Sequence, residues 1–159
     1  MAENKQLIIY FTSSGTTKRA AEKIQKATNA EIVELQPVTP YPVNYQDVAE
    51  QGKKELDSNI HPKIDLNSLP DIAKFDEIFV GFPTWWSQPP MIIHSLFDEV
   101  DFSGKTIIPF TTSMSSTMED SMPYFDEMVS KLSGVKLLDG VRYDNDGNLN
   151  NFLKDNDLI

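Results

Sequence analysis

A segment rich in hydroxyl side chains lies between an apolar run at residues 7–11 and a helical pattern. It consists of Thr12, Ser13, Ser14, Gly15, Thr16 and Thr17. A strand, a tight turn and a helix start present free backbone N–H groups, a positive dipole end and hydroxyl donors, which together suit a phosphate. Gly15 permits backbone conformations that a Cβ would obstruct. An ordinary strand-to-helix loop with a Ser or Thr N-cap has the same composition, so this segment alone leaves both interpretations open.

Better-known phosphate motifs are absent from this segment. It has no Gly-Lys-Ser/Thr ending of a nucleotide triphosphatase loop and no G-x-G-x-x-G of a dinucleotide site. The chain contains no cysteine, which excludes a cysteine-based phosphatase loop. What remains is a loop that binds phosphate through neutral donors, beside Lys18 and Arg19, whose charges either add a positive field or face solvent.

Hydrophobic periodicity predicts strands that alternate with helices along the chain. Strands are expected at 7–11, 31–35, 77–82, 105–111 and 135–138. A first helix is expected directly after the segment 12–17, and further helices at 45–58, 89–99, 118–132 and 148–157. This order predicts a parallel sheet with right-handed crossovers, helices on both faces and the continuously apolar strand 77–82 in the middle. Pro109 cannot donate to a strand ladder, so we expect a local bulge or turn in its strand.

Two further loops follow the third and fourth predicted strands, at the edge where a doubly wound sheet binds its ligand. They contain Pro83, Thr84, Trp85 and Trp86, and Thr112, Ser113, Met114 and Ser115. Adjacent side chains in an extended segment point in opposite directions, so at least one tryptophan should face this rim. The alternative is that both cover the core or a dimer contact. Beside a phosphate loop, an indole face suits a flat aromatic ring.

A phosphate at one end and a flat ring at the other describe flavin mononucleotide (FMN). The sequence resembles the short-chain flavodoxin family, in the branch with a Trp-Trp pair after the third strand. The matching stretches are residues 9–18, 40–45, 81–86 and 102–112. The resemblance implies one flavodoxin-like domain over residues 1–159, with a three-layer α/β fold and a five-stranded parallel sheet of order 2-1-3-4-5.

The resemblance also implies where FMN lies. Its phosphate is expected at residues 12–17 and its ring between the loops 83–86 and 112–115, with backbone groups of residues 84–86 near the flavin N5. Related proteins commonly have a glycine-rich turn after the fourth strand. The bulkier side chains at 112–115 would narrow the site or replace backbone contacts with hydroxyl contacts.

The implied function is redox chemistry supplied by FMN, with the protein providing position and electrostatics and no catalytic side chain. An electron carrier and a small FMN-dependent reductase using NAD(P)H both fit the sequence. The alternative from another class is a flavodoxin-fold binding or regulatory module that has lost flavin.

Composition limits the partners. The formal charge of −10, from 14 basic and 24 acidic residues, opposes binding to nucleic acid or an anionic membrane. We therefore expect a redox partner protein or a small electron acceptor, and a monomer or homodimer. Without cysteine, and with only His61 and His94 as imidazoles, a protein-bound transition metal is not expected. The first residues lack the pattern of a signal peptide, so a cytoplasmic location is expected.

Overall fold

A parallel β-sheet organises the chain in the computed structural model, which describes residues 5–113 and 116–159. Within those residues the sheet has six strands, in the order β2-β1-β3-β4-β5, with β6 also paired to β4. The predicted order 2-1-3-4-5 is confirmed, with β2 at one edge and β3 in the interior. The strands are β1 (Gln6–Tyr10), β2 (Glu31–Glu34), β3 (Glu77–Pro83), β4 (Thr106–Thr112), β5 (Lys136–Leu137) and β6 (Val141–Arg142).

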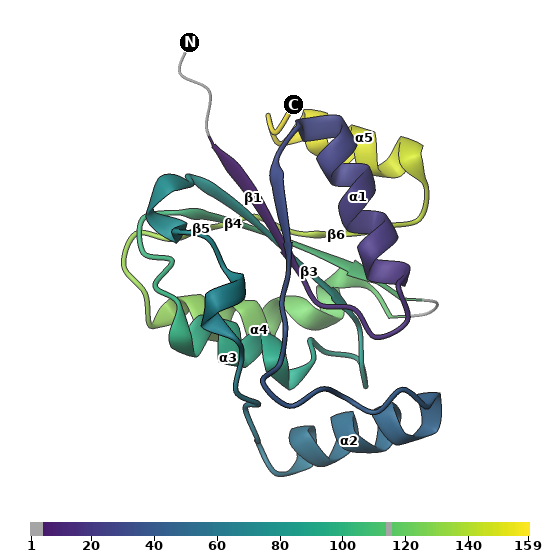
Figure 1. The fold of residues 1–159 in the computed structure, drawn as a ribbon. Coiled ribbons are helices and arrows are strands. Elements are labelled where there is room, and N and C mark those ends of the chain that lie inside the picture. The colour runs from purple at the N-terminus through teal and green to yellow at the C-terminus, as the bar shows by residue number, and fades with distance from the viewer. Residues whose placement is uncertain (1–4, 114–115) are drawn as a thin grey trace.

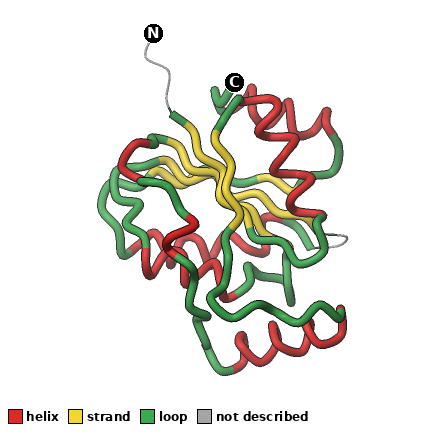
Figure 2. Tube along the Cα trace, viewed as in Figure 1, coloured by secondary structure: helices red, strands yellow, loops and turns green. Residues whose placement is uncertain are grey.

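Helices cover both faces of this sheet (Figures 1 and 2). They are α1 (Thr16–Thr28), α2 (Tyr45–Asp57), α3 (Met91–Glu99), α4 (Met118–Ser130) and α5 (Asp146–Asp155), with 3₁₀ turns at Leu66–Ser68 and Ile72–Lys74. Alternate residues of β3 enter two separate cores, because successive side chains of a strand point to opposite faces. Ile78, Val80 and Phe82 pack with α3 and α4, whereas Phe79 packs with α1 and α5. No helix in these described ranges is long and apolar enough to cross a membrane.

Pro109 does not distort its own strand, so that sequence prediction is wrong. β4 pairs with β3 without a break, from Glu77↔Thr106 to Pro83↔Thr112. The irregularity lies in the neighbouring edge strand, which is split into β5 and β6. Ile107 pairs with Leu137 but Phe110 pairs with Val141, so the edge strand contains one extra residue in this interval.

The missing N–H of Pro109 explains this bulge. Ile107 and Thr111 direct their carbonyl groups to the edge strand, where they accept bonds from the N–H groups of Leu138 and Tyr143. Pro109 lies midway between them and faces the same edge, but it has no N–H to donate. Gly140 packs there so closely that a Cβ would lie 2.3 Å from the Pro109 carbonyl oxygen. A bulge on an edge strand accommodates both constraints.

Helix α2 lies beyond one end of the sheet (Figure 1) and is held by an aromatic cluster. Trp85 makes edge-to-face contacts with Phe11 at 5.5 Å and Tyr41 at 5.6 Å between ring centroids. Its ring also lies against Gly52 of α2, where a Cβ would approach it to 2.9 Å. The Tyr41 hydroxyl donates to the buried Glu55 carboxylate at 2.7 Å. Burial, and then this carboxylate, raise the pKa of Tyr41 well above its usual range.

Candidate functional site

The carboxyl ends of β1, β3 and β4 meet at one rim through threonine hydroxyls. Thr17 of α1 and Thr112 of β4 place their Oγ1 atoms 2.8 Å apart in a buried contact. The Thr84 and Thr111 Oγ1 atoms are 2.6 Å apart, and the Thr84 N–H donates to the Thr112 carbonyl. The three loops singled out in the sequence therefore border the same region of the molecule.

The first loop has the conformation of an open helix start. Gly15 occupies the N-cap position with φ of 91°, in the left-handed region. A Cβ built on Gly15 would have no atom within 4 Å beyond its own residue and its two chain neighbours. The Gly15 N–H donates to Thr12 Oγ1 at 2.9 Å, and Ser14 and Thr16 share a hydroxyl contact at 3.2 Å. The N–H groups of the first turn of α1 have no intrahelical acceptor and point out of the helix end. Among the described residues, no side chain caps this helix start.

Thr17 differs from the rest of this segment. Its side chain is 1% exposed and its hydroxyl bonds Thr112, whereas Ser13, Ser14 and Thr16 are exposed. The Thr17 hydroxyl therefore connects α1 to the end of β4, while its backbone N–H remains part of the open helix start.

The second loop is a tight turn that separates the two tryptophans. Trp85 and Gln88 exchange two backbone hydrogen bonds of 3.0 and 3.2 Å around Trp86 and Ser87. Both central residues have positive φ, 54° and 63°, which is the pattern of a type I′ turn. Trp85 packs inward on the aromatic cluster and Trp86 is 53% exposed, so the expected divergence of the two indoles is confirmed.

Replacing Ser87 by glycine should stabilise the protein. Glycine adopts positive φ without the steric cost that a Cβ imposes, and that cost is about 1 kcal/mol for a left-handed residue. Urea unfolding should show a free energy of unfolding higher by about that amount. Ser58→Gly, at a C-cap with φ of −101°, is the control and should give no such gain. A Ser87→Gly protein that is less stable than the parent would contradict the turn assignment.

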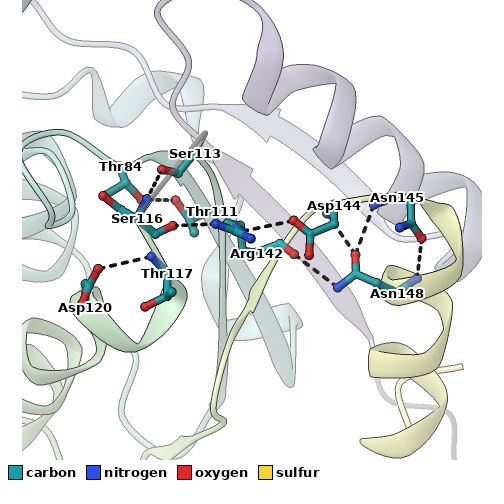
Figure 3. Close-up of polar contacts among 10 residues, drawn as sticks. All are labelled: Thr84, Thr111, Ser113, Ser116, Thr117, Asp120, Arg142, Asp144, Asn145 and Asn148. Atoms are coloured by element: carbon teal, nitrogen blue, oxygen red, sulfur yellow. Dashed lines mark hydrogen bonds and ion pairs between the residues drawn. The ribbon is translucent and has the colours of Figure 1, made fainter.

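The third loop is held by hydrogen bonds near both of its ends, and Figure 3 draws the bond between Ser113 and Ser116. At its start the Thr112 carbonyl accepts from the Thr84 N–H, and further on the Ser116 N–H donates to Ser113 Oγ at 2.9 Å. Met114 and Ser115, predicted to contact the flavin, lie outside the described residues. Thr117 caps α4 in a reciprocal arrangement with Asp120, which satisfies two backbone N–H groups at the helix start.

Two of the hollows among the described residues are lined by tryptophan or histidine side chains. An open groove of about 790 Å³ runs along the exposed side of α2 and has Trp86 as one wall; Lys53 Nζ lies 5.4 Å from the Trp86 ring centroid. A second hollow of about 410 Å³ lies between α3 and α4 and includes His61 and His94. Neither histidine belongs to the three loops.

His94 makes the stability of the fold depend on pH. Its Nε2 atom is buried without a hydrogen-bond partner among the described residues. Burial, and then the nearby His61, lower the pKa of His94, while Asp98 and Glu127 oppose this and Lys131 adds to it. The folded state therefore binds a proton less readily than the unfolded state, in which histidine has a pKa of about 6.5.

The contribution of His94 to stability is therefore complete above about pH 6.5 and is lost as the pH falls below it. Urea midpoints measured between pH 7.5 and 5 should decrease, with a shallower decrease in His94→Gln. This window lies above the ordinary pKa values of Asp and Glu side chains, about 3.9 and 4.3. Hydrogen bonds to Ser103 and Tyr143 lower the pKa values of Asp101 and Asp146 further. Equal slopes for the two proteins would contradict this assignment.

These features define a doubly wound parallel α/β protein, a class of fold that binds its ligands at the carboxyl ends of the strands. The sequence matches the family model described as flavodoxin over residues 5–154. The chain therefore belongs to the flavodoxin family.

Similar proteins agree in fold along nearly the whole chain. A flavoprotein from Bacteroides eggerthii has a TM-score of 0.82 at 27% identity, over 96% of this chain and 97% of that one. A flavoprotein from Lactobacillus acidophilus, solved in complex with FMN, has a TM-score of 0.78 at 25% identity, over 94% and 98%. A flavodoxin from Picosynechococcus is 29% identical over 140 residues, or 80% of this chain, and the match spans 65% of that protein's length.

Two residues near the rim were not singled out by sequence reasoning. Ser116 directly follows the predicted loop 112–115, and Arg142 lies in a strand that the hydrophobic pattern did not reveal. Arg142 donates to the Ser116 carbonyl and to Asp144. A two-residue strand beside a bulge has too little alternation to be recognised by periodicity.

Proposed function

We propose that this chain is an electron carrier that works through bound FMN. The observation that carries this proposal is the joining of the three rim loops through the pairs Thr17–Thr112 and Thr84–Thr111. These contacts place an open helix start beside two loops that could enclose a flat ring. The bound flavin supplies the redox chemistry, and the protein holds and orients it.

The residues of the first loop fit a phosphate group. The first turn of α1 offers N–H groups without intrahelical acceptors, at the positive end of the helix dipole. Ser13, Ser14 and Thr16 add exposed hydroxyls, and the empty space beside Gly15 allows a close approach of the ligand to the backbone. In this proposal the Thr12 hydroxyl, which accepts from the Gly15 N–H, holds the loop in shape.

The second loop contributes mainly backbone groups to the ring. A hydroxyl has one proton, and Thr111 donates its proton to the Phe82 carbonyl at 2.9 Å, so Thr84 donates to Thr111. The N–H groups of Thr84 and Trp85 are also bonded within the protein. The Trp86 N–H has no acceptor among the residues described, which makes it the donor of this loop best suited to the flavin N5. The exposed indole of Trp86 is the side chain best suited to flank the ring.

A basic electron acceptor tests the carrier function. Apoprotein reconstituted with FMN and reduced anaerobically should reduce cytochrome c, a basic haem protein, in a second-order reaction. The charge of −10 should accelerate this reaction at low ionic strength and make it slower as salt screens the attraction. A protein that takes up FMN but passes no electrons to any acceptor protein would contradict the carrier function.

The groove along α2 favours a second candidate, a reductase of a small organic acceptor. Its walls include the exposed Tyr45 and Trp86, next to the proposed ring site. Such an enzyme should oxidise NADPH or NADH continuously when a quinone is added, with saturation in quinone. If the protein oxidises NADPH or NADH no faster than free FMN does under the same conditions, the reductase function is wrong and electron transfer to a partner remains the proposed function.

A further inference from the structure

Arg142 connects the edge strand to the third loop of the rim. Its Nη1 atom donates to the Ser116 carbonyl at 3.4 Å and its Nε atom donates to Asp144 at 3.1 Å (Figure 3). The Arg142 side chain is 30% exposed, so its guanidinium is partly shielded from solvent. The residue thus links the loop that precedes α4 with the loop that precedes α5.

The bulge opposite Pro109 gives Arg142 this direction. Val141 pairs with Phe110 and enters the core under α1 and α5, so Arg142, the next residue, points to the opposite face, where α3 and α4 lie. Without the extra residue in the edge strand, Val141 would take the position beside Thr111 that Arg142 now occupies, because a one-residue shift exchanges the two faces. The extra residue in the edge strand therefore places Arg142, and not Val141, beside Thr111 at the rim.

The contacts around Arg142 fix it from both sides. The Arg142 carbonyl accepts from Asn148 Nδ2 at 3.3 Å, and Asn148 Oδ1 accepts from the Asp144 N–H at 3.0 Å. Asn145 completes the start of α5 by accepting from the Asn148 N–H at 2.9 Å. On the other side, the Ser116 N–H donates to Ser113 Oγ. Ser116 is therefore bonded to Arg142 through its carbonyl and to Ser113 through its N–H.

We propose that Arg142 is a positioning residue for flavin binding, which holds Ser116, and through the Ser116 N–H the side chain of Ser113, at the edge of the proposed ring site. This inference rests on the proposed function. Because the third loop is assigned to the ring and the α1 start to the phosphate, Arg142 affects both FMN and riboflavin. A cation that attracted the phosphate would instead affect FMN alone.

The test is a titration of apoprotein with FMN and with riboflavin, for the parent protein and Arg142→Gln. The variant should bind both flavins about tenfold more weakly, which corresponds to the loss of one hydrogen bond from a charged donor. The urea midpoint of the apoprotein should fall only modestly, because the Arg142 side chain is 30% exposed, and the visible absorption bands of bound FMN should shift. Lys23→Gln is the control, because Lys23 makes an ion pair with Asp146 on α1 and α5, away from the third loop.

Two conservative changes separate geometry from charge. Arg142→Lys keeps the charge but loses the fork that reaches Ser116 and Asp144 together, so it should remain weakened for both flavins. Asp144→Asn should give a smaller loss, equal for the two flavins. Full recovery in Arg142→Lys, a loss confined to FMN, or parent-like affinities in Arg142→Gln would overturn the proposal. A parent protein that binds neither flavin would overturn the proposed function itself.

Discussion

Replacing Gly81 by alanine is expected to lower the free energy of unfolding by about 3 kcal/mol, at the upper end of the usual cost of overpacking a core. Gly81 lies in the central strand β3, opposite Phe110 of β4. A Cβ at this position would lie 2.1 Å from the Phe110 ring, whose side chain is 1% exposed and enclosed by the core under α1 and α5. The ring cannot move without displacing its neighbours, so urea unfolding should show a much lower midpoint.

A second substitution tests the cause of this loss. Phe110→Leu in the Gly81→Ala background removes the atoms that clash, so the double variant should be more stable than the sum of the two single changes predicts. Gly104→Ala provides a contrast, since Gly104 has a positive φ but no atoms near its Cβ position. Purely additive effects at Gly81 and Phe110 would show that the close contact is not the source of the instability.

Replacing Trp85 by alanine is expected to cost about 3 kcal/mol of folding free energy, as large-to-small changes of aromatic residues in packed sites do. Trp85 contacts Phe11, the residue after β1, on one side and Gly52 of helix α2 on the other. Its removal should also speed amide hydrogen exchange in α2 more than in β3, because α2 has few other buried residues.

Trp86→Ala is the matched control for this change. Trp86 is 53% exposed, so its removal should alter stability by less than about 0.5 kcal/mol. The two neighbours should therefore separate two roles, with Trp85 governing stability and Trp86 governing the fluorescence response to flavin. If Trp86→Ala were the more destabilising of the two, the described packing of Trp85 would be wrong.

The sequence predicted the alternation of strands and helices because its signals are strong and local. The apolar run at 77–82 and the helical spacing after each strand are sufficient to indicate alternating elements. The order 2-1-3-4-5 was instead implied by the resemblance to short-chain flavodoxins. Helix α5 was expected at 148–157 and lies at Asp146–Asp155, because Asn145 forms its N-cap and accepts from the Asn148 N–H. Asparagine is common in both caps and loops, so composition alone did not locate this boundary.

The part that sequence could not give depends on contacts between distant residues. The bulge that Pro109 was expected to cause lies in the neighbouring edge strand. Pro109 has no N–H to donate to that strand, so the missing hydrogen bond changes the edge strand and leaves the strand of Pro109 regular. Thr17 was grouped with the phosphate donors, but its hydroxyl is buried against Thr112, 95 positions away. The role of Trp85 likewise depends on Gly52 and Tyr41, which no local pattern joins to it.

The measurement that tests the central claim most directly is a titration of purified apoprotein with FMN and then with riboflavin, followed by flavin and tryptophan fluorescence together. We predict saturable mutual quenching with FMN, carried mainly by Trp86 and reduced in Trp86→Ala. Riboflavin should quench in the same way but bind at least tenfold more weakly, because it lacks the phosphate that the start of α1 is proposed to hold. Equal affinities for the two flavins would contradict the phosphate site, and the absence of saturable quenching with FMN would contradict the assignment of this rim as a flavin site.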